Sequence, residues 1–393
     1  MRVLFLSQRV PFPPNRGDKI TTWRLIERMR RAHAVTVIAF AHDDEDRRAA
    51  AELRGKGIET VDVALDLARS KLRSLPLLVG SRPLTLGVYG SAEVERAVAD
   101  RVGTHDAAYA YSSSMGAFLL PHALPWVMHF AELDSDKWRQ YAGRARWPMS
   151  WVYRREHRTL ERFEGRLAAA AVTSVFCTPL EEQVFRERIP NRPSVVMHNG
   201  VDLEAFRPAP GRAEPGHVAF TGVMDYEPNV DGCAWFVEEI LPRVRERVPD
   251  VRFSIVGSRP TAAVRRLGRA PGVTVTGFVP DTAEWLARAS VAVAPLRIAR
   301  GIQNKVLEAL AMGLPTVGTT PATQGVGGTD GRELVVRDDA PGFADAVVEL
   351  LTDPGEARVL GARGRRFVEE RYDWESALAP LEAILARCVE SRA

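Results

Sequence analysis

The residues best suited to chemistry lie between Arg297 and Val317, a segment that reads RIARGIQNKVLEALAMGLPTV. We expect Gly301 to open a helix carrying Lys305 and Glu308, which lie three residues apart and therefore share a face. A glycine lets an anion approach the backbone, and the free N–H groups and positive dipole end of a helix favour that anion. The segment thus predicts a phosphate site at the start of a helix.

The side chains on this helix extend the prediction from a phosphate to a nucleotide sugar. Lys305 would add a positive charge for phosphate, and Glu308 would accept hydrogen bonds from sugar hydroxyls. The amide side chains of Gln303 and Asn304 converge on the same helix start. The alternative is an ordinary connection between a strand and a helix, with a Lys and a Glu on the surface.

The elements around this segment are typical of a doubly wound α/β fold. Short apolar runs alternate with helical patterns, which indicates parallel sheets with helices on both faces. The runs that predict strands are 2–6, 35–40, 61–65, 107–111, 126–130, 171–176 and 195–198, then 218–221, 253–256, 273–276, 290–296, 315–319 and 334–336. Helices are expected at 230–248, 262–269 and 282–289, among others, and at 356–370 and 375–389.

The length and the similar rhythm of the two halves predict two domains. A chain of 393 residues exceeds one ordinary core, so two units of roughly 150–200 residues are expected. Residues 208–216 (PAPGRAEPG) favour a linker between an N-terminal domain, 1–207, and a C-terminal domain, 217–372. Ligands bind beyond the carboxyl ends of the strands in open α/β sheets, and we expect these ends to face a cleft between the domains.

Composition and charge exclude several classes of protein. A hydrophobic share of 46% and a charged share of 26% argue against long disorder, and a net charge of +3 gives no reason to expect nucleic acid as a partner. There is no run of about 18 apolar residues, and Arg9 interrupts an N-terminal apolar run too short for a signal peptide. We therefore expect cytoplasmic residence. The three cysteines lie far apart among apolar residues, so neither a metal site nor a disulfide is expected.

Two further glycines lie where a ligand could approach the backbone. Gly222 follows the predicted strand 218–221 and is expected to border the cleft. Gly17 lies in the proline-rich loop 11–19 before a helix and is expected to meet the phosphates from the other domain. A rigid turn is an equally good interpretation of that second loop.

Residues suited to an acceptor substrate follow the predicted strand 126–130. Asp134 and His129 are the candidate catalytic groups there, since a carboxylate at the carboxyl end of a strand can accept a proton; otherwise they are caps or surface charges. Residues 137–158 hold seven Lys or Arg, one Glu and five Trp or Tyr, which suits an anionic membrane surface. The alternative is a solvated helical face with core aromatics. The residues assigned to the membrane or acceptor surface are Lys137, Trp138, Arg144, Arg146, Trp147 and Trp151.

Several of these segments together resemble the family 4 glycosyltransferases, also called glycosyl transferases group 1. NGVDLEAF at 199–206, the linker, and GIQNKVLEALAMGLPTV at 301–317 carry the resemblance. It implies the GT-B fold, two Rossmann-like doubly wound domains facing a cleft, and transfer of a sugar from a nucleoside diphosphate with retention. VLFLSQRVPFPPNRGDK, HFAELDSDKWRQYA, FTGVMDYEPNVDG and PLRIARGIQNKVLEA further resemble sugar transferases of exosortase and PEP-CTERM exopolysaccharide systems.

The resemblance assigns roles to particular positions. Glu308 corresponds to the second glutamate of a paired motif and would bind the ribose, but Arg300 stands where the first glutamate contacts the donor sugar. The loop VMDYEPN lacks the basic residues that usually grip the phosphates, so Lys305 or Arg297 would replace them. Residues 279–281 would lie near the base. The resemblance also implies that the last helix, within 373–393, crosses back to the first domain and that His129 lies on the acceptor side.

The expected mechanism is retaining transfer without a metal ion or other cofactor. The helix start and Lys305 would stabilise the departing diphosphate by preorganised charge. The residues expected to bind the donor are Gly17, Gly222, Val279, Arg297, Arg300, Gly301, Ile302, Gln303, Asn304, Lys305 and Glu308, and the catalytic candidates are Asp134, His129 and Lys305. The preferred acceptor is a lipid-linked saccharide or polysaccharide at the cytoplasmic face of the inner membrane.

Three other functions fit parts of the sequence. A nucleotide-sugar 2-epimerase of the same fold would convert the donor without any acceptor. A non-catalytic protein would bind nucleotide sugar without turnover, which the absence of the first glutamate makes plausible. A membrane or polysaccharide scaffold would use residues 137–158 alone. No G-x-G-x-x-G, Walker A, H-E-x-x-H or G-x-S-x-G sequence supports a nicotinamide, kinase-like or hydrolase function.

Overall fold

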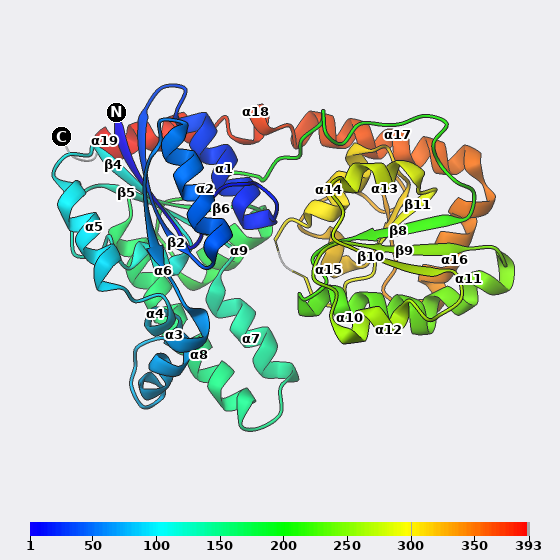
Figure 1. The fold of residues 1–393 in the computed structure, drawn as a ribbon, viewed down its shortest axis with the longest axis horizontal. Coiled ribbons are helices and arrows are strands. Elements are labelled where there is room, and N and C mark those ends of the chain that lie inside the picture. The colour runs from blue at the N-terminus through cyan, green and yellow to red at the C-terminus, as the bar shows by residue number, and fades with distance from the viewer. Residues whose placement is uncertain (300, 391–393) are drawn as a thin grey trace. The chain divides into compact units, whose positions relative to one another are not determined.

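The chain forms two compact units, each built on its own parallel sheet (Figure 1). The structure is a computed structural model that describes residues 1–299 and 301–390, apart from the side chain of Arg144. Unit 1 comprises Met1–His198 and the chain from Leu378 onward, and unit 2 comprises Asn199–Ala377. The α/β fold with two Rossmann-like sheets is therefore confirmed.

The sheet of unit 1 has seven strands in the order β3-β2-β1-β4-β5-β6-β7, all parallel. They are β1 (Arg2–Ser7), β2 (Ala34–Ala41), β3 (Glu59–Ala64), β4 (Ala107–Tyr111), β5 (Trp126–Ala131), β6 (Thr173–Phe176) and β7 (Ser194–Val196). The helices are α1 (Gly17–Met29), α2 (Asp44–Gly55), α3 (Leu67–Ser74), η1 (Leu75–Val79), α4 (Leu84–Val88), α5 (Ala92–Val102), α6 (Ser113–Gly116), α7 (Asp134–Arg144), α8 (Met149–Ala170), α9 (Pro179–Arg188) and α19 (Leu381–Glu390).

The sheet of unit 2 has six parallel strands in the order β10-β9-β8-β11-β12-β13. They are β8 (His217–Thr221), β9 (Arg252–Val256), β10 (Val273–Gly277), β11 (Val291–Ala294), β12 (Thr316–Gly318) and β13 (Val335–Val336). The helices are α10 (Glu227–Trp235), η2 (Phe236–Ile240), α11 (Leu241–Arg247), α12 (Ala262–Leu267), α13 (Thr282–Arg288), α14 (Asn304–Ala311), α15 (Thr320–Thr323), α16 (Ala340–Thr352), α17 (Pro354–Arg371) and α18 (Trp374–Ala377).

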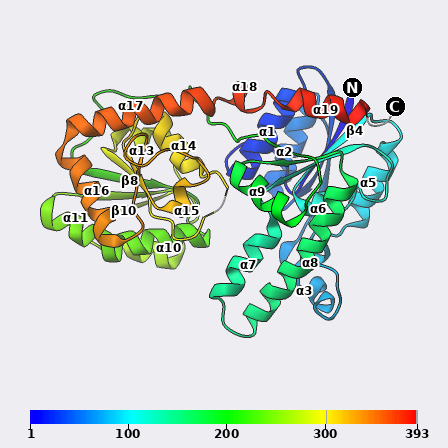
Figure 2. The same cartoon turned by 180° about the vertical axis from the view of Figure 1, so that it is seen from behind.

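Burial on both faces explains why the strands read as continuous apolar runs. In β1 every residue from Val3 to Leu6 is fully buried, and helices cover both faces of each sheet (Figures 1 and 2). All thirteen predicted strands are present, with ends that differ by a few residues. The strand order places β1 beside β4, and β8 beside β11, so the chain reverses direction across each sheet at these pairs. Ligands of doubly wound folds bind beyond the carboxyl ends of such strands.

The crossings between the units lie elsewhere than the sequence predicts. The chain crosses at 198/199 and again at 377/378, so residues 208–216, the predicted linker, lie inside unit 2. Glu214 anchors this segment, because its carboxylate accepts hydrogen bonds from Arg252 at 2.7 Å and Arg288 at 2.6 Å. Proline and glycine here make an ordered surface turn rather than a hinge.

The end of the chain returns to unit 1 through a broken helix. One helix was expected over 375–389, but α18 ends at Ala377 and α19 begins at Leu381, just after Pro380, which disfavours a continuous helix. Helix α19 packs on β4 and β5, and Glu382 lies 2.9 Å from His33 Nε2.

A helical arm extends from the sheet of unit 1, visible in both ribbon views (Figures 1 and 2). It consists of α3, η1, α4, α7 and the N-terminal half of α8. Glu156 on α8 is buried, and its carboxylate accepts hydrogen bonds at 2.8 Å from the backbone N–H groups of Leu84 and Thr85 and from the Thr85 hydroxyl. These are donors at the start of α4, so Glu156 fastens α4 to α8.

Glu156→Ala is predicted to loosen this arm. The substitution leaves three partly buried donors without their acceptor, which should lower the free energy of unfolding by about 2–4 kcal/mol. Urea unfolding should show the loss, and amide exchange of residues 84–88 should accelerate. Glu161→Ala, on the same helix, is the control and should shift stability by less than about 0.5 kcal/mol. Equal stability and exchange in both variants would contradict the anchoring role.

Candidate functional site

Three loops of unit 2 meet at the carboxyl ends of its central strands. Gly222 follows β8, and its N–H donates to the carbonyl of Val256 at 3.0 Å. A Cβ on Gly257, which follows β9 with φ of 150°, would lie 1.7 Å from the carbonyl oxygen of Gly222. A Cβ on Gly222 would lie 2.7 Å from Asn229 Nδ2 and 3.4 Å from Lys305 Cε. These positions accept only glycine, because neighbouring backbone and side chains fill the space of any Cβ.

Lys305 lies in this junction, on the first turn of α14. Its Nζ is 5.5 Å from the centroid of the Phe220 ring, a cation–π contact. Among the residues that the structure describes, the Lys305 side chain forms no hydrogen bond and no ion pair within 4.0 Å. Burial lowers the pKa of Lys305 to about 8, while the charge of Glu308 acts to raise it. A desolvated cation without a direct partner is suited to bind an anion.

Glu308 faces the same space from one turn further along α14. Burial raises the pKa of Glu308 to about 7, and the charge of Lys305 opposes that rise. The shared face expected for these two side chains is consistent with this mutual interaction. Near neutral pH the pair combines a cation for phosphate with a carboxylate that can accept hydrogen bonds from hydroxyl groups.

Asn229 is a member of this site that the sequence did not single out. Its side chain is 3% exposed, and its Nδ2 donates to the carbonyl of Val223 at 2.8 Å. The Oδ1 atom is buried and accepts no hydrogen bond from the described part of the chain. Because an unsatisfied buried acceptor is costly, Asn229 is a candidate to accept a hydrogen bond from a ligand beside Gly222. The only signal in the sequence was Pro228 at the helix start, which marks the loop but not the side chain.

Arg297 occupies a different position from the one expected. Its Nε lies 3.0 Å from Asp231 Oδ2, and Nη2 contacts Asp231 Oδ1, so the guanidinium forms a bidentate ion pair. The guanidinium carbon also lies 5.8 Å from the Trp235 ring. Arg297 is therefore committed to α10, and Lys305 is the better candidate for a phosphate ligand.

The predicted helix start is three residues too early. Helix α14 begins at Asn304, after Gln303 in an extended conformation, and Gly301 has φ of +61°, which is not helical. The Gln303 side chain does not cap the helix, so the first N–H groups of α14 have no side-chain cap. A Cβ on Gly325 would lie 1.9 Å from the Gly301 carbonyl oxygen, which shows that this loop is closely packed.

The remaining donor-side residues are divided among several places. Ile302 packs against the core of unit 2, and Val279 lies half-buried beyond the end of β10. Gly17 begins α1 in unit 1. Arg300 lies outside the described residues. The expected roles of Gly17, Val279 and Ile302 toward a donor stay predictions.

Asp134 is the first residue of α7 and lies at the carboxyl end of β5. Its carboxylate accepts a hydrogen bond from the Ser113 hydroxyl. Burial raises the pKa of Asp134, while Lys137 and the Ser113 hydrogen bond act to lower it. Next to Ser113, the Ser114 hydroxyl accepts a hydrogen bond from Gln8 at 2.7 Å. Residues following β1, β4 and β5 thus form a polar cluster at this edge of the sheet.

His129 is not part of that cluster. The side chain is 1% exposed, within β5, and its Nδ1 lies 2.7 Å from the Tyr109 hydroxyl, with Cys177 Sγ 3.6 Å from Nε2. Burial lowers the pKa of His129 to about 3, so the ring is neutral at physiological pH. The predicted catalytic role of His129 is wrong, because the sheet core encloses the ring.

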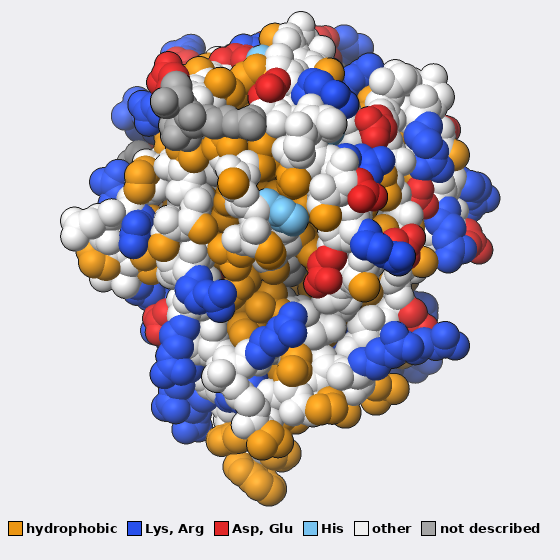
Figure 3. Space-filling model, turned by 90° about the vertical axis from the view of Figure 1, so that its left-hand side faces the viewer, with side chains coloured by type: hydrophobic (Ala, Val, Ile, Leu, Met, Phe, Trp, Pro, Cys, Tyr) orange, Lys and Arg blue, Asp and Glu red, His pale blue; other side chains and the backbone are white. Residues whose placement is uncertain are grey.

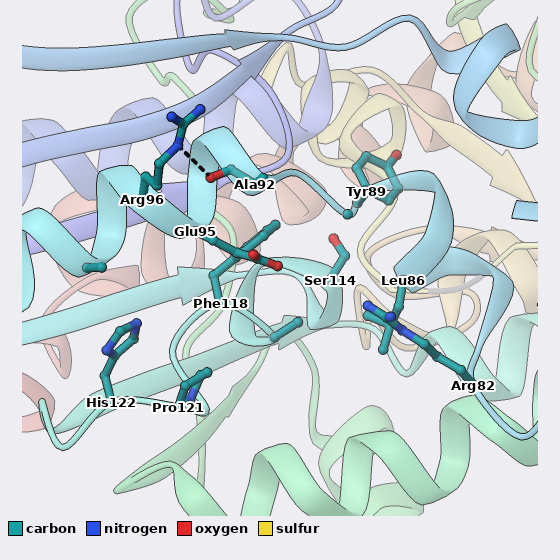
Figure 4. Close-up of a pocket in the computed structure, with 13 residues that line it drawn as sticks. Arg82, Leu86, Tyr89, Ala92, Glu95, Arg96, Ser114, Phe118, Pro121 and His122 are labelled. Atoms are coloured by element: carbon teal, nitrogen blue, oxygen red, sulfur yellow. Dashed lines mark hydrogen bonds between the residues drawn. The ribbon is translucent and has the colours of Figure 1, made fainter. Parts of the chain in front are cut away.

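A cavity of about 450 Å³ opens beside the Asp134 cluster, within unit 1 (Figure 4). This volume lies in the range of pockets that hold small ligands. Figure 4 shows the carboxylate of Glu95, the hydroxyl of Ser114 and the guanidinium of Arg82 around its centre, with the Phe118 ring forming one wall. Charged groups that bond hydroxyls, together with an aromatic wall, are suited to a saccharide.

The residues expected at a membrane or acceptor surface fall into two groups. Trp147 and Trp151 are 83% and 53% exposed, and Arg146 is also exposed. Trp138 instead packs partly buried against the core of unit 1, with its ring 5.2 Å from that of Tyr153, so only part of its side chain is available to a surface. Lys137 lies 3.5 Å from Glu132, and the side chain of Arg144 is outside the description.

No group of three or more His, Cys, Asp or Glu side chains that could hold a metal ion occurs in residues 1–299 and 301–390. Over the same residues, no helix has the length and apolar character needed to cross a bilayer.

Comparisons with known proteins match part of the second unit to a family. Residues 215–353 match the family described as glycosyl transferases group 1. The GDP-mannose-dependent alpha-(1-6)-phosphatidylinositol monomannoside mannosyltransferase of Mycolicibacterium smegmatis is 33% identical over 173 residues, 39% of this chain and 44% of the relative. The D-inositol 3-phosphate glycosyltransferase of Kribbella flavida is 32% identical over 211 residues, 46% of this chain and 47% of the relative. The chain thus spans about half the length of the curated relatives it matches.

Solved structures match over the whole chain. Sucrose-phosphate synthase of Thermosynechococcus elongatus has a TM-score of 0.74 with 17% identity and covers all of both chains. Anabaena HepE in complex with UDP has a TM-score of 0.71 with 15% identity, covering 98% of this chain and all of that one. Residues 215–353 therefore match the glycosyl transferases group 1 family, and the chain as a whole has the GT-B fold of two Rossmann-like parallel α/β units.

Affinity for a nucleotide sugar is predicted to fall as pH rises above about 8. Deprotonation of Lys305, whose pKa burial lowers to about 8, removes the positive charge while the sugar-linked diphosphate keeps its negative charges. Calorimetric titration should show Kd rising about tenfold between about pH 7.5 and about pH 9, one unit beyond that pKa.

Lys305→Arg is the matched control for this pH dependence. The guanidinium stays protonated over the same range, so its affinity should be flat from about pH 7.5 to about pH 9. If the unsubstituted protein is equally flat, Lys305 does not contact the diphosphate.

Proposed function

We propose that the protein is a retaining glycosyltransferase that moves a sugar from a nucleoside diphosphate to a saccharide or lipid-linked acceptor. The observation that carries this proposal is the junction of Gly222, Asn229, Lys305 and Glu308 at the carboxyl ends of β8 and β11. The backbone there can approach a ligand closely, and the site holds a carboxylate and a cation that has no ion pair among residues 1–299 and 301–390. All of these groups lie within the part of the chain that matches the family.

In the proposed mechanism, charge placed in advance stabilises the leaving diphosphate. Lys305 and the first N–H groups of α14 face the phosphates, and Glu308 accepts hydrogen bonds from the ribose. Asn229 Oδ1 accepts a further hydrogen bond from the donor. No divalent cation takes part, because these groups supply the positive charge that a metal would otherwise provide.

The donor is proposed to be a hexose nucleotide. Relatives are named as GDP-mannose-dependent mannosyltransferases, which favours GDP-mannose, whereas a neighbour in structure binds UDP. Arg300 in place of the usual first glutamate favours a charged or unusual sugar. A panel of donors therefore has to include both GDP-sugars and UDP-sugars.

The acceptor is proposed to bind in unit 1. Asp134 would accept a hydrogen bond from the hydroxyl that attacks, and the cavity beside it would hold the rest of the saccharide. The names of relatives include phosphatidylinositol mannoside as a lipid acceptor, which supports a lipid-linked saccharide. The resemblance to exosortase-associated transferases favours a role in exopolysaccharide synthesis at the cytoplasmic face of the inner membrane.

The decisive experiment incubates the purified chain with GDP-mannose, UDP-glucose and related donors, with lipid-linked saccharides as acceptors, with and without EDTA. The proposal predicts a product that keeps the donor's anomeric configuration, seen by NMR, and a rate unaffected by EDTA. Epimerised donor without acceptor would favour a 2-epimerase. Thermal stabilisation by donor without any turnover would favour a non-catalytic binding protein, and neither binding nor turnover would overturn the donor site.

Changes in the cavity are predicted to affect the acceptor alone. Glu95→Gln and Arg82→Gln remove charges that would bond acceptor hydroxyls, so the acceptor KM should rise about tenfold, as for one or two lost charged hydrogen bonds. Donor affinity should not change. Glu93→Gln, on the same helix but outside the cavity lining, is the control. An unchanged acceptor KM in both cavity variants would remove the acceptor from this cavity.

A further inference from the structure

Bulky apolar side chains are exposed together at the end of the helical arm. Val79 is 95% exposed and Trp147 83%, although large apolar side chains are normally buried. We call this surface the arm tip. It consists of Leu72, Leu75, Val79, Trp147, Met149 and Trp151. Figure 3 is a space-filling view of one side of the molecule. It shows hydrophobic side chains gathered at the lower end, with Lys and Arg side chains beside and above them.

The arm tip joins two segments that are far apart in the sequence. Leu72, Leu75 and Val79 come from α3 and η1, and the other three residues from the turn before α8 and its first turn. Arg155 on α8 ties the segment around Val79 to that helix. Its guanidinium donates to the backbone carbonyls of Leu77, Leu78 at 2.9 Å, Gly80 at 2.6 Å and Arg82 at 2.9 Å. The residues on either side of Val79 are therefore fixed to α8, and the exposed side chains are presented by an ordered scaffold.

The segments that form the arm tip carry an excess of positive charge, although some of their cations pair with carboxylates just outside them, namely Arg69, Lys137, Arg139 and Arg155. Residues 67–92 and 137–155 together contain ten Lys or Arg and no Asp or Glu, although the net charge of the whole chain is only +3. Such a distribution is far from the interspersed charges of an ordinary surface. Tryptophan with lysine and arginine is typical of the boundary between lipid acyl chains and head groups.

We infer that the arm tip binds the surface of a membrane rich in anionic lipids. The apolar side chains enter the head-group layer, and the surrounding basic side chains pair with lipid phosphates. A protein partner would need an apolar patch enclosed by acidic groups, whereas an anionic bilayer presents both features over any area. The inference rests on the proposed function in one respect, that a lipid-linked acceptor would be reached from this surface.

Vesicle co-sedimentation of the full chain tests this inference. Neutral phosphatidylcholine vesicles are compared with vesicles containing phosphatidylglycerol. Binding to the anionic vesicles should be at least about tenfold stronger and should weaken with added salt, since surface charge attraction is screened. Absence of binding to anionic vesicles, or equal binding to neutral ones, would overturn the inference.

Two variants separate the apolar and the charged contributions. Val79→Ser/Trp147→Ser/Trp151→Ser removes exposed apolar groups, and Arg73→Gln/Arg82→Gln/Arg146→Gln removes charge. Each should weaken vesicle binding at least about tenfold. The matched controls change exposed residues elsewhere, namely Leu180→Ser/Val359→Ser/Val389→Ser and Arg243→Gln/Arg266→Gln/Arg269→Gln, and should bind as the unsubstituted protein does. If the tip variants bind like their controls, the arm tip is not the membrane surface.

A second measurement distinguishes this inference from the proposed function. The apolar tip variant should keep the thermal shift produced by a nucleotide sugar, because the donor site lies in unit 2. Vesicle binding by a protein that transfers no sugar would uphold the arm tip and remove the proposed function. Sugar transfer by a protein that binds no vesicles would uphold the proposed function and overturn the membrane role of the arm tip.

Discussion

Lys305 and Glu308 lie together on α14, near the carboxyl ends of the central strands, and the proposed chemistry of unit 2 depends on this pair. Burial brings the pKa of the cation down to about 8 and that of the carboxylate up to about 7, so both lie close to neutrality. Such groups respond strongly to a nearby anion, because little water screens them. Gly222 and Gly257 make the arrangement possible, since any Cβ at either position would occupy space already filled by its neighbours.

The close packing at these glycines also explains how the loops meet at the carboxyl ends of the strands. Parallel strands bring the ends of β8, β9 and β11 to one edge, and the glycines let the loops pack together there. Asn229 is buried by this packing, and its Oδ1 is left without a partner among the described residues. Arg297 pairs with Asp231, so among the residues that the structure describes Lys305 is the better candidate for a phosphate ligand. The proposed phosphate site therefore rests on a few side chains whose positions are set by backbone geometry.

Much of the fold follows from local pattern. Continuous apolar runs such as Val3–Leu6 predict buried parallel strands because both sheet faces are covered, and this pattern marks the central strands; all thirteen predicted strands are present. The helix start at Asn304 was misplaced because a glycine signals a bend without saying which residues after it become helical. The linker was misplaced for a similar reason: proline and glycine mark a turn, while the ion pairs of Glu214 that anchor it are tertiary.

The site in unit 1 was less predictable, since it depends on which side chains become buried. His129 and Trp138 have residue types typical of function, but the sheet encloses His129, and Trp138 is partly buried against the core of unit 1. The arm tip could not be predicted because it depends on η1 lying beside α8. Arg155 makes that contact with residues more than seventy positions away in the sequence. Segment 137–158 alone indicated an aromatic and basic surface. It gave no sign that Leu72, Leu75 and Val79 would belong to the same surface.

The central claim is that a nucleotide sugar binds where α10 and α14 begin. Hydrogen–deuterium exchange of the full chain, with and without saturating GDP-mannose or UDP-glucose, tests it most directly. The account predicts slower exchange in peptides covering residues 222–230 and 301–308 with one of these donors, and loss of that protection in Glu308→Ala. Protection confined to other segments of unit 2, or none with any nucleotide sugar, would contradict it.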